Sequence, residues 1–317
     1  MRKNIFILAV GLLIVVFVAS LFFVVFERNT TEGVLAESEE EERIPSLEVP
    51  NIEGLGAVVY DIDKDMVLYG KNERVPLPLA SITKLMTVIT AYDYLSSDSI
   101  IVIKKSDTDV EGESNLRVGE KWTLEDLSAY SLVVSSNDGV SAIARSAEEA
   151  SFQNSGEYKS FVELMNKKAN DLGFVQTVFL NPTGLDMTPA IAGGYGSAYE
   201  VAILMKIFIK EFPSLSEATS QKEIVKSPIG GLPKKARNTN ISTDDIPFLF
   251  SSKTGFTDQA GGNLVLSFAP GVSNPFIVTV LGSTKEKRFI DVKTLVNRTI
   301  RHINTKEEAA DETEQST

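Results

Sequence analysis

The sequence predicts an α+β fold in which strands from both ends of one domain form a single antiparallel sheet. Two β-like runs, at 57–60 and 66–69, stand early in the chain, and three more lie between 248 and 281. Helical patterns dominate the passage between them. Strands at both ends with helices between them are typical of an antiparallel sheet flanked by helices. We therefore expect such a sheet, with the middle of the chain forming a helical subdomain.

The predicted strands have clear boundaries. The runs 57–60 and 66–69 are joined by Asp-Ile-Asp-Lys-Asp, which indicates a β-hairpin. After a passage rich in Gly, Pro and Asn, three apolar runs read as strands, at 248–255, 263–269 and 276–281.

The helical patterns are also specific. Thr123 with Asp126 resembles a capping box at the start of a helix. One apolar stripe at helical spacing is expected to face the core, and it comprises Phe161, Leu164, Met165, Ala169 and Leu172. A closing helix is predicted at 285–302.

The N-terminus carries a candidate membrane segment. Residues 5–26 contain no charge and are long enough to cross a bilayer as one transmembrane helix. Arg2 and Lys3 before this run favour a cytoplasmic N-terminus of residues 1–4, with the remaining chain extracytoplasmic at the cell membrane. A cleaved signal peptide is the alternative, but the run is longer than a usual signal core and no small-x-small site closes it.

Composition divides the rest of the chain. Residues 27–50 are acidic and predicted to be a solvated tether, and residues 306–317 are predicted to be an acidic disordered tail. Residues 51–305 are then long enough for one catalytic domain with a sizeable core. The net charge of −12 argues against a nucleic-acid partner. One histidine and no cysteine exclude disulfides and a usual zinc site, so no metal or cofactor is expected.

A serine stands where an extended, proline-containing approach gives way to a predicted helix at 81–95. Ser81 begins this helix and Lys84 lies one turn later on the same side. A serine hydroxyl needs a base to become a nucleophile, and His302 is the chain's only histidine. A lysine can serve if burial or a second cation lowers its pKa from about 10.4 to roughly 7 or 8.

Two further motifs supply the groups that this chemistry needs. Ser135-Ser136-Asn137 stands between two helical patterns, and Lys253-Thr254-Gly255 ends a predicted strand. Lys253 would be the second cation and would pair with a substrate carboxylate. Ser135 could relay a proton from Lys84 to the leaving amine, and Asn137 could orient Lys84 and bind a substrate amide.

The third motif also predicts how a substrate would bind. Gly255 allows a peptide to approach the strand edge closely, as an added strand. The backbone N–H groups of Ser81 and Phe256 could hold the oxyanion that develops during acyl transfer.

S-x-x-K, S-x-N and K-T-G in this order are typical of penicillin-binding proteins and class A β-lactamases. Residues 54–303 more specifically resemble the serine D-alanyl-D-alanine carboxypeptidases, the low-molecular-mass penicillin-binding proteins. The segments that carry this resemblance are Ala80-Ser81-Ile82-Thr83-Lys84-Leu85-Met86-Thr87, Met165-Asn166-x-Lys168-Ala169, Leu172-Gly173, Phe179-x-Asn181-Pro182-x-Gly184-Leu185 and Lys253-Thr254-Gly255-Phe256-Thr257.

The resemblance implies a β-lactamase/transpeptidase-like fold and a peptidoglycan stem peptide ending in D-Ala-D-Ala as substrate. It also implies an acyl-enzyme on Ser81, Lys84 as base, and covalent inhibition by β-lactam antibiotics. Arg288 resembles a family arginine that assists at the substrate carboxylate. Ser136 departs from the glycine that many members carry. Many members also have a second β-domain and a C-terminal anchor, which the run at 5–26 would replace.

Three alternatives stay open at this point. A β-lactamase would need a deacylating glutamate, and Glu163 is a superficial candidate that fits a surface helix position better. An endopeptidase acting on peptidoglycan cross-links would use the same residues and differ only in its cleft. An inactive wall-binding protein would not need an intact Ser81, Lys84 and Lys253.

Overall fold

The computed structural model describes residues 51–112, 114–271 and 275–315, with side chains up to residue 305. The expected anchor at 5–26 and the tether at 27–50 lie outside these ranges. Within the described ranges, no helix combines the length and the apolar composition that a bilayer crossing requires.

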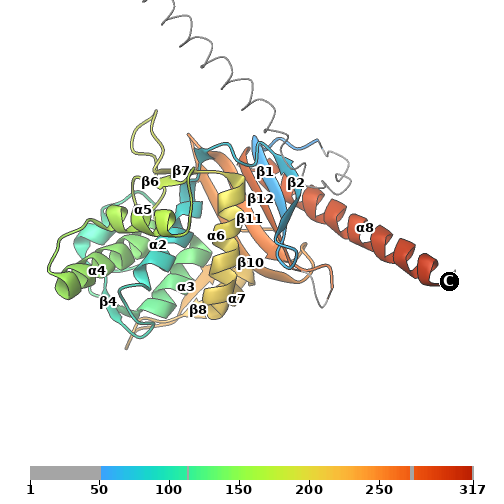
Figure 1. The fold of residues 1–317 in the computed structure, drawn as a ribbon. Coiled ribbons are helices and arrows are strands. Elements are labelled where there is room, and N and C mark those ends of the chain that lie inside the picture. Colours follow the sequence, from blue (N-terminus) through green and yellow to red (C-terminus); the bar gives the residue numbers. More distant parts are fainter. Residues whose placement is uncertain (1–50, 113, 272–274, 316–317) are drawn as a thin grey trace, which may run out of the picture. The chain divides into compact units, whose positions relative to one another are not determined.

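Five antiparallel strands form the main sheet, and they come from both ends of the described chain (Figure 1). Their order is β10-β11-β12-β1-β2. This confirms that the early hairpin and the three late strands share one sheet. The bounds are β1 (Gly56–Asp61), β2 (Met66–Lys71), β10 (Leu249–Thr257), β11 (Gly261–Phe268) and β12 (Phe276–Ser283).

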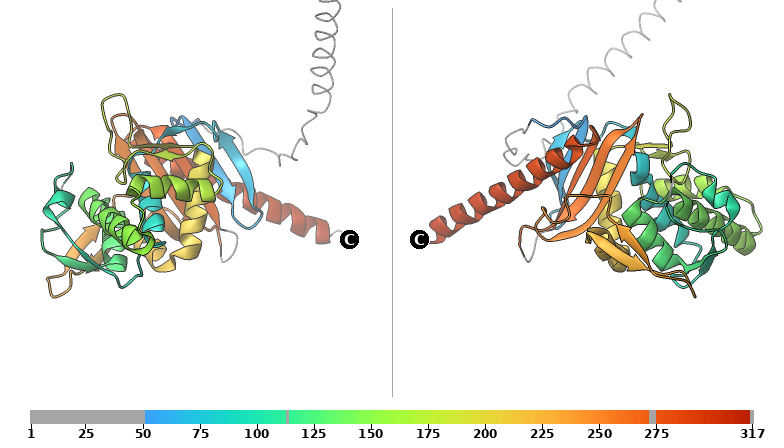
Figure 2. Two further views of the ribbon diagram at one scale, coloured as in Figure 1. Left: turned by 60° about the vertical axis from the view of Figure 1, so that its left-hand side comes forward. Right: turned by 180° about the vertical axis from the view of Figure 1, so that it is seen from behind.

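Helices cover both faces of this sheet, and the alternation of strand side chains explains why. In β1, Val58 and Tyr60 belong to the core that includes α6 (Ala198–Glu211). Ala57 and Val59 point the other way and pack with residues of α8 (Lys287–Gln315). Figure 2 shows α8 on the face opposite α6. Because both faces are covered, all six residues of β1 are buried.

The middle of the chain forms the expected helical region beside the sheet (Figure 1). Its central helix is α2, in which all nine residues are buried, including Lys84. The helices are α2 (Thr83–Ala91), α3 (Leu124–Val134), α4 (Asn137–Ser155), α5 (Phe161–Asp171) and α7 (Pro213–Ser220). Two 3-10 turns complete it, η1 (Ala80–Ile82) and η2 (Lys105–Thr108).

Short strand pairs connect these helices to the sheet. β3 (Leu77–Pro78), β7 (Gly194–Gly196) and β6 (Val178–Phe179) form a small three-stranded sheet next to η1. β4 (Ile100–Val102) pairs with β5 (Lys121–Thr123), and β8 (Glu223–Lys226) pairs with β9 (Lys234–Arg237).

The helix predictions hold with adjusted boundaries. The Thr123 side chain caps α3 by accepting a hydrogen bond from Asp126 N, at 3.1 Å. The stripe of α5 is buried from Phe161 to Ala169, and Leu172 follows the helix as a half-buried cap. The helix expected at 81–95 is shorter, because Ser81 lies in η1 and α2 ends at Ala91.

The C-terminal segment differs from the prediction. Residues 306–315 continue α8 to Gln315 and do not form the expected disordered tail. The physical reason is local: this segment contains Lys, Glu, Ala and Asp with neither Gly nor Pro, and Ala, Glu and Lys are good helix formers. High charge alone therefore did not correctly predict disorder for this segment.

Candidate active site

Ser81 and Lys84 meet at the start of α2. Lys84 Nζ lies 2.8 Å from Ser81 Oγ, so the predicted nucleophile and base are in direct hydrogen-bond contact. Ser81 lies in η1, directly after Ala80, whose φ of +49° is in the left-handed region. A non-glycine residue in that region is strained, and such strain is often found at functional sites.

A second contact fixes the lysine. Lys84 Nζ donates to the backbone O of Thr183 at 2.6 Å. The turn that presents this carbonyl is held by Asn181, whose Oδ1 accepts from Thr183 N at 3.1 Å and from Gly184 N at 2.7 Å. Thr87 Oγ1 donates to Pro182 O at 2.6 Å and ties the same turn to α2. The sequence identified this segment as part of the family pattern but interpreted it only as a turn, so the role of Thr183 was missed.

Gly184 explains why the turn sits so close to the nucleophile. Its φ is +79°, and a Cβ atom added there would lie 1.9 Å from Ala80 O. The turn and the segment that carries Ser81 are therefore in backbone contact, which only glycine permits at this position.

The environment of Lys84 favours its neutral form. The side chain is fully buried, and burial holds its pKa well below the ordinary 10.5. The nearby charge of Lys253 lowers the pKa further. A neutral amine at hydrogen-bond distance from Ser81 Oγ can accept the hydroxyl proton.

Lys253 comes from β10 and Ser135 from the end of α3. Lys253 Nζ donates to Ser135 Oγ at 2.9 Å and to Thr254 O at 2.8 Å. Ser135 has φ 60° and ψ 40°, a left-handed conformation that ends α3 and turns the chain into α4. Ser136, the departure from the family glycine, caps α4 by accepting from Gly139 N at 2.9 Å.

Burial also controls the second lysine. It lowers the pKa of Lys253 to about 7, and the Arg288 guanidinium contributes to the same shift. Arg288 is itself buried, which lowers its pKa to about 10. Its Nη1 donates to Gly255 O at 2.6 Å, and its Nε has no partner among the described residues. Arg288 therefore contacts the motif strand directly.

Asn137 makes a different contact from the one expected. Its Nδ2 donates to Glu111 O at 2.6 Å, and its hydrogen bonds do not include Lys84. Lys84 is oriented by Ser81 and Thr183 instead. The Oδ1 of Asn137 is buried without a partner among the described residues, so it can accept a hydrogen bond from a substrate amide.

The remaining motif residues lie along β10, the terminal strand of the sheet. A Cβ on Gly255 would lie 2.8 Å from Leu79 O and 3.2 Å from Ser81 N, so the strand passes close to the nucleophile's backbone. The side chain of Phe256 is 41% exposed. Thr254 Oγ1 lies 2.6 Å from Thr239 Oγ1, a contact that the sequence did not predict.

Comparison with known proteins assigns the chain to a family. The family model described as D-alanyl-D-alanine carboxypeptidase matches residues 41–285. The chain belongs to this family. Its relatives include the D-alanyl-D-alanine carboxypeptidase DacF of Bacillus subtilis, 31% identical over 77% of this chain. A D-alanyl-D-alanine endopeptidase of Pseudomonas aeruginosa is 30% identical over 75% of this chain and 74% of its own length. The chain spans 61% of the length of the Bacillus relative.

Solved structures show the same fold. Penicillin-binding protein D2 from Listeria monocytogenes, solved in an ampicillin-bound form, has a TM-score of 0.66 and 26% identity. It covers 79% of this chain and 99% of its own. The D-alanyl-D-alanine carboxypeptidase from Mycobacterium tuberculosis has a TM-score of 0.70 at 24% identity and covers 83% of this chain and 96% of its own. The predicted transpeptidase-like α+β fold is therefore confirmed.

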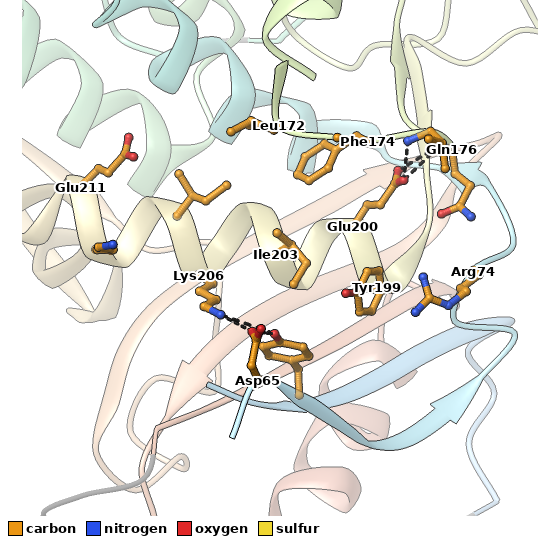
Figure 3. A pocket seen from close by; sticks show the side chains of 15 residues that line it. Asp65, Arg74, Leu172, Phe174, Gln176, Tyr199, Glu200, Ile203, Lys206 and Glu211 are labelled. Atoms are coloured by element: carbon orange, nitrogen blue, oxygen red, sulfur yellow. Dashed lines mark hydrogen bonds and ion pairs between the residues drawn. The ribbon is translucent and has the colours of Figure 1, made fainter. Parts of the chain in front are cut away.

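A separate hollow of about 480 Å³ lies beside α6, and none of the residues of the S-x-x-K, S-x-N and K-T-G motifs line it (Figure 3). Its polar groups mostly satisfy one another. Lys206 pairs with Asp65, and Arg74 lies 4.0 Å from the ring centroid of Tyr199. Glu200 accepts from Gln176 N at 3.0 Å. These contacts give the hollow a structural role.

Proposed function

We propose that this protein is a serine D,D-carboxypeptidase that removes the terminal D-Ala from peptidoglycan stem peptides. The observation that carries the proposal is the contact of 2.8 Å between Ser81 Oγ and a fully buried Lys84 whose pKa is lowered. Family membership and the three motifs support the same reaction.

In the proposed acylation step, Ser81 Oγ attacks the carbonyl carbon of the penultimate D-Ala and its proton passes to Lys84 Nζ. The N–H groups of Ser81 and Phe256 hold the oxyanion. The C–N bond then breaks, and the leaving amine of the terminal D-Ala takes a proton through Ser135. Water subsequently hydrolyses the ester and regenerates Ser81.

Lys253 and Thr254 would bind the carboxylate of the terminal D-Ala. With a pKa of about 7, Lys253 is partly neutral in the free protein. A bound carboxylate favours the charged form and returns the proton to Lys253. A β-lactam, which also carries a carboxylate, would acylate Ser81 through the same contacts.

The test is release of D-Ala from a blocked peptide ending in Lys-D-Ala-D-Ala, using a fragment that begins near Ile44. Wild type should release D-Ala and Ser81→Ala should not. Release by both proteins would refute the serine mechanism. An unreactive wild type that still binds the peptide would support the inactive wall-binding alternative.

Endopeptidase activity on cross-links is the second candidate, because an endopeptidase is among the relatives at 30% identity. Cross-linked muropeptide offered beside the short peptide separates the two activities. The β-lactamase alternative has less support, because Glu163 is exposed and caps α5 through Ser160, with Ser160 N donating to Glu163 at 2.7 Å.

We further propose that residues 5–26 anchor the chain in the cell membrane, with the catalytic domain extracytoplasmic. The uncharged run and the preceding Arg2 and Lys3 support this orientation. The full chain should remain with washed membranes and be degraded by external protease in spheroplasts. A full chain that washes off, or that resists the protease, would contradict the anchor.

A further inference from the structure

A second hollow, of about 1250 Å³, lies between two segments of the chain. One wall is the loop 115–121, and the other is the turn of the β8–β9 hairpin with the start of β9, residues 228–235. Tyr130 of α3 also lines it. We call this hollow the cationic groove, because four basic side chains and one acidic side chain line it: Arg117, Lys121, Lys234, Lys235 and Glu120. It carries a net charge of +3 in a chain of net charge −12.

Two of the four basic side chains in the groove have no ionic partner in the described part of the protein. Lys234 pairs with Glu120 at 2.7 Å, with both side chains mostly buried, and Lys235 pairs with Glu223 at 3.0 Å. Arg117 and Lys121 are exposed, and neither side chain has a hydrogen bond or ion pair within the described part of the chain. Two unpaired cations in one groove favour an anionic ligand.

The cationic groove is connected to the catalytic residues through α3. Tyr130 lines the groove and Ser135 ends the same helix, five residues later, a rise of about 7.5 Å. Tyr130 Oη donates to Ser114 O at 2.8 Å, next to the loop that forms the first wall. Asn137 Nδ2 binds Glu111 O in the same segment.

The second wall leads to the active site as well. β9 carries Lys234 and Lys235 and is followed by Thr239, whose Oγ1 lies 2.6 Å from that of Thr254. Figure 1 shows β8, the partner of β9, lying beside α3. Both walls of the groove are thus continuous in sequence with segments that contact the catalytic motifs.

We propose that the cationic groove binds carboxylate groups of the stem peptide upstream of the cleaved bond. This inference rests on the proposed function. An extended peptide spans about 3.3–3.6 Å per residue, so three upstream residues reach about 10 Å from the scissile bond. That reach exceeds the rise of about 7.5 Å along α3 between Tyr130 and Ser135, so an extended stem peptide is long enough to cover this distance. Arg117 and Lys121 then determine a preference for acidic substrates.

The experiment compares two peptides that end in Lys-D-Ala-D-Ala and differ only in glutamate or glutamine upstream of the lysine. The full chain is assayed as wild type and as the double variant Arg117→Gln/Lys121→Gln. The control double variant, Lys210→Gln/Arg301→Gln, removes two exposed positive charges outside the groove.

Wild type and the control should prefer the glutamate peptide in kcat/KM, and the preference should weaken as salt increases. In the groove variant, kcat/KM should fall about three- to tenfold for the glutamate peptide and change little for the glutamine peptide. Equal kcat/KM for both peptides in wild type, or an unchanged preference in the groove variant, would overturn the inference.

Binding keeps the inference testable if turnover fails. If neither peptide releases D-Ala, the proposed function is wrong. The dissociation constants of the same peptides, measured with Ser81→Ala, still show whether the groove binds carboxylates. Tighter binding of the glutamate peptide that is lost in the groove variant supports the inference. A groove variant that loses binding only to a poly(glycerol phosphate) chain, and keeps its peptide preference, would contradict it.

Discussion

Replacing Gly184 with alanine tests whether the turn at 181–184 holds the nucleophile and the base together. A Cβ there would lie 1.9 Å from Ala80 O and 2.5 Å from Ala80 C. Such contacts stay above about 3.0 Å in real structures, so the two backbones must separate by about 1 Å. A displacement of 1 Å in reacting groups can cost about 10²-fold in rate.

A matched control exists at Gly173, which has the same φ of +79° but no atom within 4 Å of an added Cβ. Gly184→Ala and Gly173→Ala should both lose about 1–2 kcal/mol of unfolding free energy, because a left-handed conformation disfavours alanine. Only Gly184→Ala carries the additional clash. The difference between the variants therefore isolates the contact with Ala80.

The assay is the rate of acylation by a fluorescent penicillin, with thermal unfolding measured on the same samples. We expect Gly173→Ala to acylate like wild type and Gly184→Ala to acylate about 10²-fold more slowly while folded. Equal acylation rates for the two variants would show that the turn does not position Ser81 and Lys84, and would refute the reasoning.

Three further predictions concern the lysines and the domain's stability. Ser135→Ala removes the acceptor of Lys253 Nζ and the proposed proton relay. The value of kcat/KM for D-Ala release should therefore fall about 10²–10⁴-fold. A variant that releases D-Ala as fast as wild type would exclude the relay. Activity should rise with pH as Lys84 loses its proton. Lys253→Met should shift this rise to higher pH, because it removes the charge that lowers the pKa of Lys84. A pH profile that does not shift would contradict the coupling between the two lysines. Asp291 of α8 is buried and accepts three hydrogen bonds from the segment before β1 and from β12. Asp291→Ala should therefore lower the free energy of unfolding in urea by about 3 kcal/mol. A decrease below about 1 kcal/mol would argue that these hydrogen bonds do not stabilise the domain.

Features encoded by local patterns could be predicted from the sequence. The hairpin of β1 and β2, the three late strands and the stripe of α5 all follow from apolar periodicity. Ser81 and Lys84 could be paired because they are one helical turn apart, and the effect of the Lys253 charge on the pKa of Lys84 could be predicted from the motif set.

Other features depend on contacts between distant segments. Thr183 acts through its backbone carbonyl, which every residue possesses, so its side chain gave no indication. The contact between Thr239 and Thr254 joins β10 to the segment after β9, and no spacing rule brings them together. The partner of Asn137 likewise comes from a loop 26 residues earlier.

The central claim is that Lys84 is a neutral base in the folded protein, and the most direct measurement is its pKa. Lysine side-chain nitrogen NMR of the fragment beginning near Ile44, assigned with Lys84→Arg, follows the charge on Lys84 as the pH changes. The account predicts a pKa well below the ordinary 10.5 that rises when Lys253 is replaced by methionine. A Lys84 that titrates near 10.5, or one that does not respond to Lys253→Met, would contradict it.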